Sequence, residues 1–175
     1  AITYYSRATG NWNAATTWST AGCGGAAAAG TPTTNDVVFI CNGNTVSVTA
    51  NVTVNSVTIQ NGGTLQTGTT GGGANRTVTI NGNFVILNGG TYIHNNNQVA
   101  ATTIFNGTEN FEPTSTFRVN AWSGTGASLV TGCSSNFGHV TLNWNPGLFY
   151  WNNNGLGYTR TIAGTFTVNT NCATY

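Results

Sequence analysis

The chain has 175 residues, the size of a single domain, and its 39% hydrophobic content is sufficient for a core. Only 4% of its residues are charged, against about 25% in ordinary globular proteins. Because the chain lacks a basic stripe to follow phosphates, an acidic cluster to hold calcium and an apolar run long enough to cross a bilayer, we expect no nucleic-acid partner, no cofactor or metal, and no membrane insertion.

Residues 1–35 are expected to form an aromatic-rich N-terminal cap. Tyr4, Tyr5, Trp12 and Trp18 lie among Gly, Asn and Thr, and a Gly- and Ala-rich loop follows them. Aromatic residues at this density favour the closure of one end of a β core. The alternative interpretation is a platform on which carbohydrate stacks.

A short phrase returns four times within residues 37–109. Each copy is a β-branched run, which suits a half-buried strand, that leads to Asn-Gly, which suits a tight bend. The isoleucines of the four copies are 19, 21 and 24 residues apart, a period typical of solenoids, and they are Ile40, Ile59, Ile80 and Ile104. We therefore predict an all-β fold, a right-handed parallel β-helix of about seven coils over residues 36–175, with these isoleucines stacked. A β-sandwich of hairpins is the alternative, since Asn-Gly also marks hairpins.

Further strands are expected on either side of these bends. The predicted second strands of the repeat are Thr45–Val48, Thr64–Thr67 and Phe84–Leu87, with a short strand at Val52–Val54. Later first strands are expected at Thr116–Val119, Val140–Leu142 and Arg160–Ile162. With a last strand around Phe166 and Val168, residues 1–175 are interpreted as one domain.

The four cysteines, Cys23, Cys41, Cys133 and Cys172, include no CxxC pair. An even number without metal-ligand spacing favours disulfides and an oxidising compartment. Three pairings are possible, and we expect Cys23–Cys41 and Cys133–Cys172, each local to one end of the solenoid. Together with the nearly uncharged surface, the cysteines predict an extracellular protein.

The few chemically active side chains do not predict an enzyme. Glu109 and Glu112 are expected on a solvated bend rather than across a glycosidic bond. His94 and His139 are expected as separate polar turn or surface residues. A polysaccharide-degrading β-helix is therefore disfavoured. Threonines such as Thr45, Thr64 and Thr67 could form a hydroxyl grid of the ice-binding kind, but the irregular period disfavours that function too.

Carbohydrate binding is the alternative to a purely structural role. Trp144, Tyr150 and Trp151 lie beside several asparagines in a long segment near the C-terminus. Flat rings next to amides suit the stacking of sugars, so these three residues are the candidate glycan contacts, with surface polysaccharide as the partner. The competing interpretation is that the rings pack the segment onto the solenoid.

The N-terminal sequence resembles a known class of modules. The string YYSRATGNWNAATTWS, a Cys and Gly-rich spacer and then NDVVFICNGNTVSV are similar to the opening module of large secreted surface proteins of Bacteroidota-type bacteria. The resemblance covers roughly residues 4–67 and implies a β-helical, Thr- and Asn-rich adhesin or fibre component, typically exported by the type IX route. It marks a module class and implies no catalytic residues.

The ends of the predicted solenoid suggest self-assembly. Residues 161–168 form an uncharged strand pattern without Pro, and such an edge is a template for another strand. We expect that strand to come from further modules of a longer chain or from Ile2–Ser6 of a neighbouring copy, which would give a head-to-tail filament. The predicted assembly edge is Ile2, Thr3, Tyr4, Tyr5, Ile162, Phe166 and Val168. The predicted function is therefore a non-enzymatic extracellular subunit of a surface fibre or adhesin.

Overall fold

The computed structural model describes residues 1–67, 76–95, 103–105, 107–120, 130–131, 136–143 and 161–168. The described part is all-β, and its single helix is the short 3-10 helix η1 (Ala15–Thr17). The strands form three sheets of six, seven and four strands.

Each sheet takes strands from along the whole described chain. The first sheet contains β1 (Thr3–Ser6), β3 (Trp18–Ser19), β4 (Val37–Ile40), β7 (Ser56–Ile59), β10 (Phe84–Ile86) and β13 (Glu109–Phe111). The second contains β2 (Gly10–Asn11), β5 (Thr45–Val48), β8 (Thr64–Thr67), β11 (Thr91–His94), β14 (Thr116–Val119), β16 (His139–Leu142) and β17 (Phe166–Val168). The third contains β6 (Val52–Val54), β9 (Val78–Ile80), β12 (Thr103–Phe105) and β15 (Val130–Thr131).

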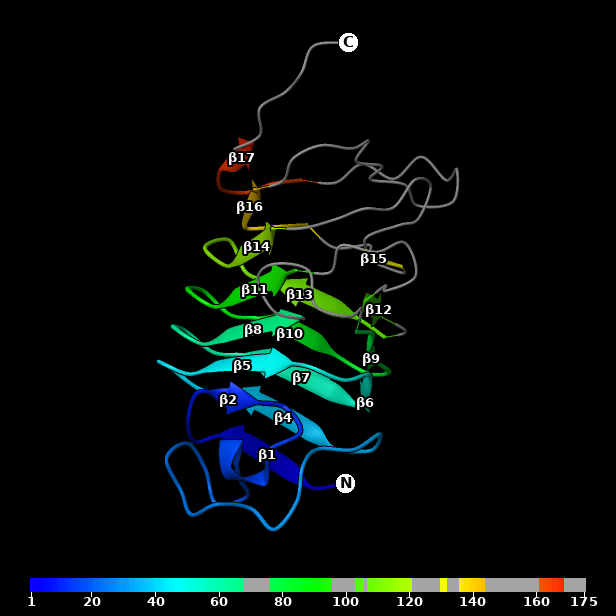
Figure 1. Cartoon of the computed structure of the whole chain (residues 1–175). Helices are drawn as coiled ribbons and strands as arrows, with labels where there is room; N and C mark the ends of the chain where they lie inside the picture. The colour runs from blue at the N-terminus through cyan, green and yellow to red at the C-terminus, as the bar shows by residue number, and fades with distance from the viewer. Residues whose placement is uncertain are drawn as a thin grey trace.

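From β4 to β15 the chain visits the three sheets in a fixed order, first, second and third, before it returns to the first. Each such passage, called a circuit below, adds one strand to each sheet. Figure 1 shows the consequence: the second-sheet strands rise from β2 near the N-terminus to β17 near the C-terminus in sequence order.

Strand pairing is almost entirely parallel. Among the described strands, only β1 and β3 pair antiparallel, and every other paired set of strands is parallel. A sandwich of Asn-Gly hairpins would instead pair consecutive strands antiparallel. No described Asn-Gly bend joins two strands of one sheet, because the chain changes sheet at each bend.

The register corrects the predicted stack of isoleucines. Ile40 and Ile59 are paired as expected, but the next partner in that column is Ile86, followed by Phe111. Ile80 instead pairs with Val54 and Phe105 in the third sheet. The predicted spacing of 19, 21 and 24 therefore mixed two sheets. Partners in the first sheet are 19 (59−40), 27 (86−59) and 25 (111−86) residues apart.

The same mixing misplaced three predicted strands. Residues 84–87 were expected as a second strand, but β10 pairs with β7 in the first sheet. Residues 116–119 and 140–142 were expected as first strands, but β14 and β16 lie in the second sheet. The positions of these strands were predicted well, whereas their sheets depend on loop lengths that local pattern does not encode.

The Asn-Gly pairs also serve two different corners. Gly43 and Gly62 have φ values of 76° and 70°, and their turns lie between the first and second sheets, where Gly89 continues the column with φ 76°. Each turn donates a backbone N–H to the turn of the next circuit, from Gly43 to Gly62 and from Gly62 to Gly89. Gly107 lies at the corner between the third and first sheets, where any Cβ would clash with the backbone of Gly82. Only the first two copies of the phrase therefore need Gly for its φ.

Alternate residues of most strands face a shared core. The burial pattern of β4, β5, β7, β8, β11, β14 and β16 alternates between half-buried and buried positions. Large apolar side chains meet in the later circuits: the ring centroids of Phe84 and Phe111, and those of Phe111 and Phe137, are both 5.3 Å apart. An amide ladder ties successive circuits, since Asn120 donates to Asn95 over 3.0 Å and Asn143 donates to Asn120 over 3.1 Å.

The N-terminal end of the stack is closed by its own residues. Strands already form within the expected cap, because β1 pairs with β4 and β2 pairs with β5. Trp12 and Trp18 are buried and meet edge to face with their centroids 5.0 Å apart. The indole N–H of Trp18 donates to the carbonyl of Trp12 over 2.7 Å. These rings cover the end of the core rather than facing solvent, so Trp12 and Trp18 are not a carbohydrate platform.

Candidate functional site

The cysteines of the N-terminal region form the expected disulfide. Cys23 and Cys41 are bonded, with their Cα atoms 5.9 Å apart, and the bond fixes the loop after β3 to the residue that follows β4. Cys133 and Cys172 lie outside the described residues, so their pairing stays a prediction.

Asp36 has a structural role at the start of β4. Its carboxylate accepts the backbone N–H of Ile2 over 2.7 Å, the backbone N–H of Thr33 over 2.9 Å and the Thr33 hydroxyl over 2.8 Å. Burial raises the pKa of Asp36, but these hydrogen bonds outweigh burial, and the net pKa lies below the usual value of 3.8. The carboxylate thus holds the beginning of the chain against β4.

The two glutamates do not lie on one solvated bend. Glu109 begins β13 and is half-buried at the register position of the buried Phe84, on the core side. Glu112 accepts the backbone N–H of Asn88 over 2.6 Å. The expectation that both carboxylates are solvated was wrong for Glu109, because an extended strand replaces the predicted bend. One carboxylate faces inward and the other holds a turn, so they do not present the facing pair that glycoside hydrolysis needs.

The expectation of a surface position was wrong for His94. It lies on the core side of β11, is fully buried, and its Nδ1 is 3.3 Å from the Tyr92 hydroxyl. Burial lowers the pKa of His94 from 6.5 to about 3, so its imidazole is neutral at physiological pH. His139 is half-buried and its Nδ1 accepts the backbone N–H of Thr165 over 2.9 Å. Within the described residues, no three His, Cys, Asp or Glu side chains are grouped as metal ligands.

Threonines form one regular row on the outer side of the second sheet. Thr45, Thr64, Thr91 and Thr116 are consecutive partners in register and all are half-buried. The neighbouring outward row is Ser47, Gln66, Ile93 and Arg118, and Thr67 is fully buried. The hydroxyl grid considered above would need at least two such rows, so this face presents a single row of threonines.

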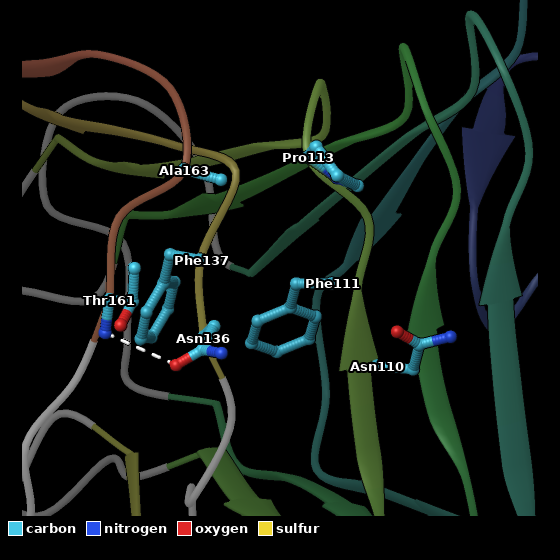
Figure 2. Close-up of a pocket in the computed structure, with 7 residues that line it drawn as sticks. All are labelled: Asn110, Phe111, Pro113, Asn136, Phe137, Thr161 and Ala163. Atoms are coloured by element: carbon cyan, nitrogen blue, oxygen red, sulfur yellow. Dashed lines mark hydrogen bonds between the residues drawn. The ribbon is translucent and has the colours of Figure 1, made fainter.

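A pocket of about 410 Å³ lies beyond β13, at the C-terminal side of the first sheet. Figure 2 shows Phe111 and Phe137 side by side within it, with Pro113 at one end and Thr161 at the other. The backbone N–H of Thr161 donates to the side-chain oxygen of Asn136 over 3.1 Å. The lining carries no charged group, and consists of Asn110, Phe111, Pro113, Asn136, Phe137, Thr161 and Ala163.

Sequence reasoning did not find this pocket, although a signal for it was present. Phe111, Phe137 and Ala163 are each 26 residues apart (137−111 and 163−137), and so are Asn110 and Asn136. This spacing agrees with the 25- to 27-residue steps of the later circuits in the register. A search at that period would have aligned these residues, whereas the shorter expected period hid them.

The predicted assembly residues lie at opposite ends of the stack. In β1, Thr3, Tyr4 and Tyr5 pair with β4, Tyr5 also pairs with β3, and Tyr4 is buried. At the other end, Phe166 and Val168 are 51% and 45% exposed, as is Ile2 (49%) at the beginning of β1. Ile162 forms a bridge with Phe137. The structure does not test whether these residues mediate assembly.

The candidate glycan contacts Trp144, Tyr150 and Trp151 lie outside the described residues. The aromatic pair that the described part does expose is Tyr5 and Phe39, which stack on the outer side of the first sheet with centroids 5.2 Å apart and an interplanar angle of 13°. Both rings are half-buried.

No protein-family model, curated protein or solved structure matches this chain. In the described part, none of the helices has the length and apolar character needed to span a membrane. Functional inference therefore rests on the residues and their arrangement.

Proposed function

We propose that the chain is a non-enzymatic structural module of an extracellular surface fibre or adhesin, built as a right-handed parallel β-helix whose three sheets are the faces. The observation that carries this proposal is the fixed order in which the chain visits three parallel sheets, from β4 through β15. Such a fold grows by adding like coils, each of which contacts only its neighbours. The seven strands of the second sheet correspond to the seven coils expected.

The use of polar groups supports a structural role. Asp36 and Glu112 accept backbone N–H groups, and asparagines link successive circuits through their amides. Side chains committed to such bonds stiffen a stack but are poorly placed for acid–base chemistry. The inward position of Glu109 and the burial of His94 support the same conclusion.

The disulfide supports an extracellular location. Disulfides persist in oxidising compartments and are rare where thiols are kept reduced. A chain with four Arg and no Lys also offers trypsin-like proteases few cleavage sites, which suits an exposed fibre. The partners proposed are further copies of this chain or further modules of a longer one.

Head-to-tail assembly by exchange of β1 has a structural requirement. β1 is already paired with β4, and Asp36 holds the N–H of Ile2. A copy that donated Ile2–Ser6 to a neighbour would have to break both contacts. Assembly that leaves β1 in place is therefore the less costly form of this proposal.

Small-angle scattering of the purified chain tests the structural proposal. A β-helix is a rod, so we expect an elongated particle whose length reflects strands spaced about 4.8 Å apart along its axis. A compact, near-spherical particle would contradict the coil architecture. Robust hydrolase or lyase activity on a panel of polysaccharides, abolished by Glu109→Gln or Glu112→Gln, would overturn the non-enzymatic role.

Carbohydrate binding is the second candidate, and the uncharged pocket beyond β13 favours it. Its amides, hydroxyl and apolar rings suit the hydroxyls and C–H faces of a neutral sugar. A glycan array with the wild-type chain, followed by Asn136→Ala, tests this candidate, with Thr58→Ala on the outer side of β7 as the control. Loss of binding in the pocket variant alone would support it. If neither a glycan signal nor a change in Trp fluorescence is found, carbohydrate binding fails.

A further inference from the structure

We propose that two copies of this chain pair end to end through their C-terminal strands, β17 against β17, about a two-fold axis. The proposal rests on the structural function above and deepens it, because it names the partner as a second copy and the contact as one particular end. It differs from the head-to-tail filament, which would join unlike ends.

The first observation is that the core-facing columns of the second sheet lose their cover at β17. One column runs through Val46, Leu65, Tyr92, Phe117 and Val140, all of which are at most 2% exposed, and ends at Phe166, which is 51% exposed. The parallel column ends at Val168, which is 45% exposed, although the preceding Leu142 is 7% exposed. These side chains occupy core positions without a following layer.

The second observation concerns the strand edge. β17 is the last strand of the second sheet and pairs with β16 on one side. An edge strand presents a row of N–H and C=O groups that another strand can pair with. Exposed apolar side chains and an open strand edge at one place are the two features that a further β layer would satisfy together.

The opposite end does not offer a complementary surface. β3 lies antiparallel on β1, so the direction of the strands reverses there. The hydroxyl of Thr17 donates to the carbonyl of Asn11 over 2.9 Å, which occupies an acceptor at the edge of β2. Trp12 and Trp18 fill the space over the core. A neighbour's N-terminal end would therefore bring no open ladder to β17, whereas a neighbour's C-terminal end would.

Charge permits the two-fold contact. Around a two-fold axis each residue lies close to its own copy, so a charged side chain in the patch would repel itself. The described residues of this end, 161–168, include no charged residue. An axis perpendicular to the second sheet keeps both core sides on one face and makes the two strands antiparallel. Thr167, between Phe166 and Val168, then lies nearest the axis.

A cysteine cross-link tests this geometry on the full chain. Thr167→Cys places identical thiols near the axis, so mild oxidation should convert most of the chain to a covalent dimer on a non-reducing gel. Thr141→Cys is the matched control, because Thr141 is the register partner of Thr167 one strand further in. The wild-type chain, with its four native cysteines, shows any background that must be subtracted.

Sedimentation velocity across concentration supplies the second measurement. We expect a monomer–dimer equilibrium that Phe166→Lys weakens about tenfold or more, since a charge at an interface anchor is costly. Thr58→Lys, on the outer side of β7, should leave the equilibrium unchanged. A wild-type monomer at every concentration would overturn the proposal, and so would species that grow beyond the dimer without a cross-link gained at position 167. A rod-shaped monomer in scattering would leave the structural function standing.

Discussion

The two ends of the strand stack differ in how their last strands are covered. At the N-terminal end, β3 reverses direction on β1 and two tryptophans fill the core space. At the C-terminal end, β17 continues the parallel register and leaves Phe166 and Val168 exposed. The stack therefore has one end built to stop the sheets and one end built like an interior layer.

This difference indicates what ends a parallel stack. Each interior layer satisfies its backbone and its apolar side chains by the next layer, which is 19 to 27 residues away in the sequence. An end needs both substitutes at once: groups that occupy the strand edge and bulky side chains that cover the core. The N-terminal end has both, and its disulfide and Asp36 hold them in place.

Truncation of one aromatic ring at each end should give the largest contrast. Trp18→Ala removes a fully buried ring and is expected to cost about 3–5 kcal/mol. Phe166→Ala removes a ring that is half-exposed and should cost less than about 1 kcal/mol in the dilute chain. Urea unfolding at low protein concentration measures both. Equal losses would show that the two ends are covered alike.

Removal of the Cys23–Cys41 bond should loosen only the closed end. The bond spans 18 residues, for which loop-closure entropy gives about 3 kcal/mol. In the double variant Cys23→Ser with Cys41→Ser, we expect faster hydrogen exchange near residues 18–45. The strands β10 and β11 serve as the internal control. Faster exchange confined to residues 57–104 would contradict a role for this bond at the end of the stack.

Acid should weaken the middle of the stack before the N-terminal contact. The unfolded chain protonates His94 near pH 6.5, whereas the folded chain resists protonation down to about pH 3. Stability from this residue is therefore complete above pH 6.5 and falls with pH, by about 3 kcal/mol at pH 4. Asp36, whose folded pKa is lowered, contributes stability that is lost only as pH falls below 3.8.

His94→Leu is the matched test of the acid effect, since it keeps an apolar side chain in the core. Unfolding free energies measured from pH 7 to pH 4 should decline less steeply in this variant than in the wild type. Identical slopes would assign the acid sensitivity to other groups.

The smallest expected effect compares two equivalent turns. Gly43→Ala and Gly62→Ala both force a side chain into the left-handed region, at a cost of about 1–2 kcal/mol. A Cβ at Gly43 meets no atom within 4 Å, whereas one at Gly62 would clash with the side chain of Asn42. Gly62→Ala should therefore be the more destabilising in thermal unfolding. If the two variants are equal, the turns do not restrain one another.

Much of the local structure was predictable from the chain. The strands at Val37–Ile40, Thr45–Val48 and Ser56–Ile59 follow from β-branched runs that alternate with polar residues, and the structure has the same bounds. The aromatic N-terminal closure and the Cys23–Cys41 bond also follow from composition and spacing. These features depend on residues near one another in sequence.

The candidate site was not predictable in the same way. His94 has the sequence context of a turn, yet its strand pairs with β8 and β14 and the residue faces the core. Glu109 likewise has apolar partners that come from another circuit. The pocket joins β13 to segments near residues 136 and 161, which become neighbours only through the 26-residue spacing.

The sequence by itself determined where strands form, where the chain bends and that the surface is almost uncharged, because these depend on side-chain type and on period-two alternation. Only the tertiary structure decided which strand joins which sheet, which polar residues are buried and which end is covered. The physical reason is that burial in a parallel stack is set by the layer above and the layer below. Those layers are a full circuit away along the chain, and a change of a few residues in a loop exchanges one partner for another.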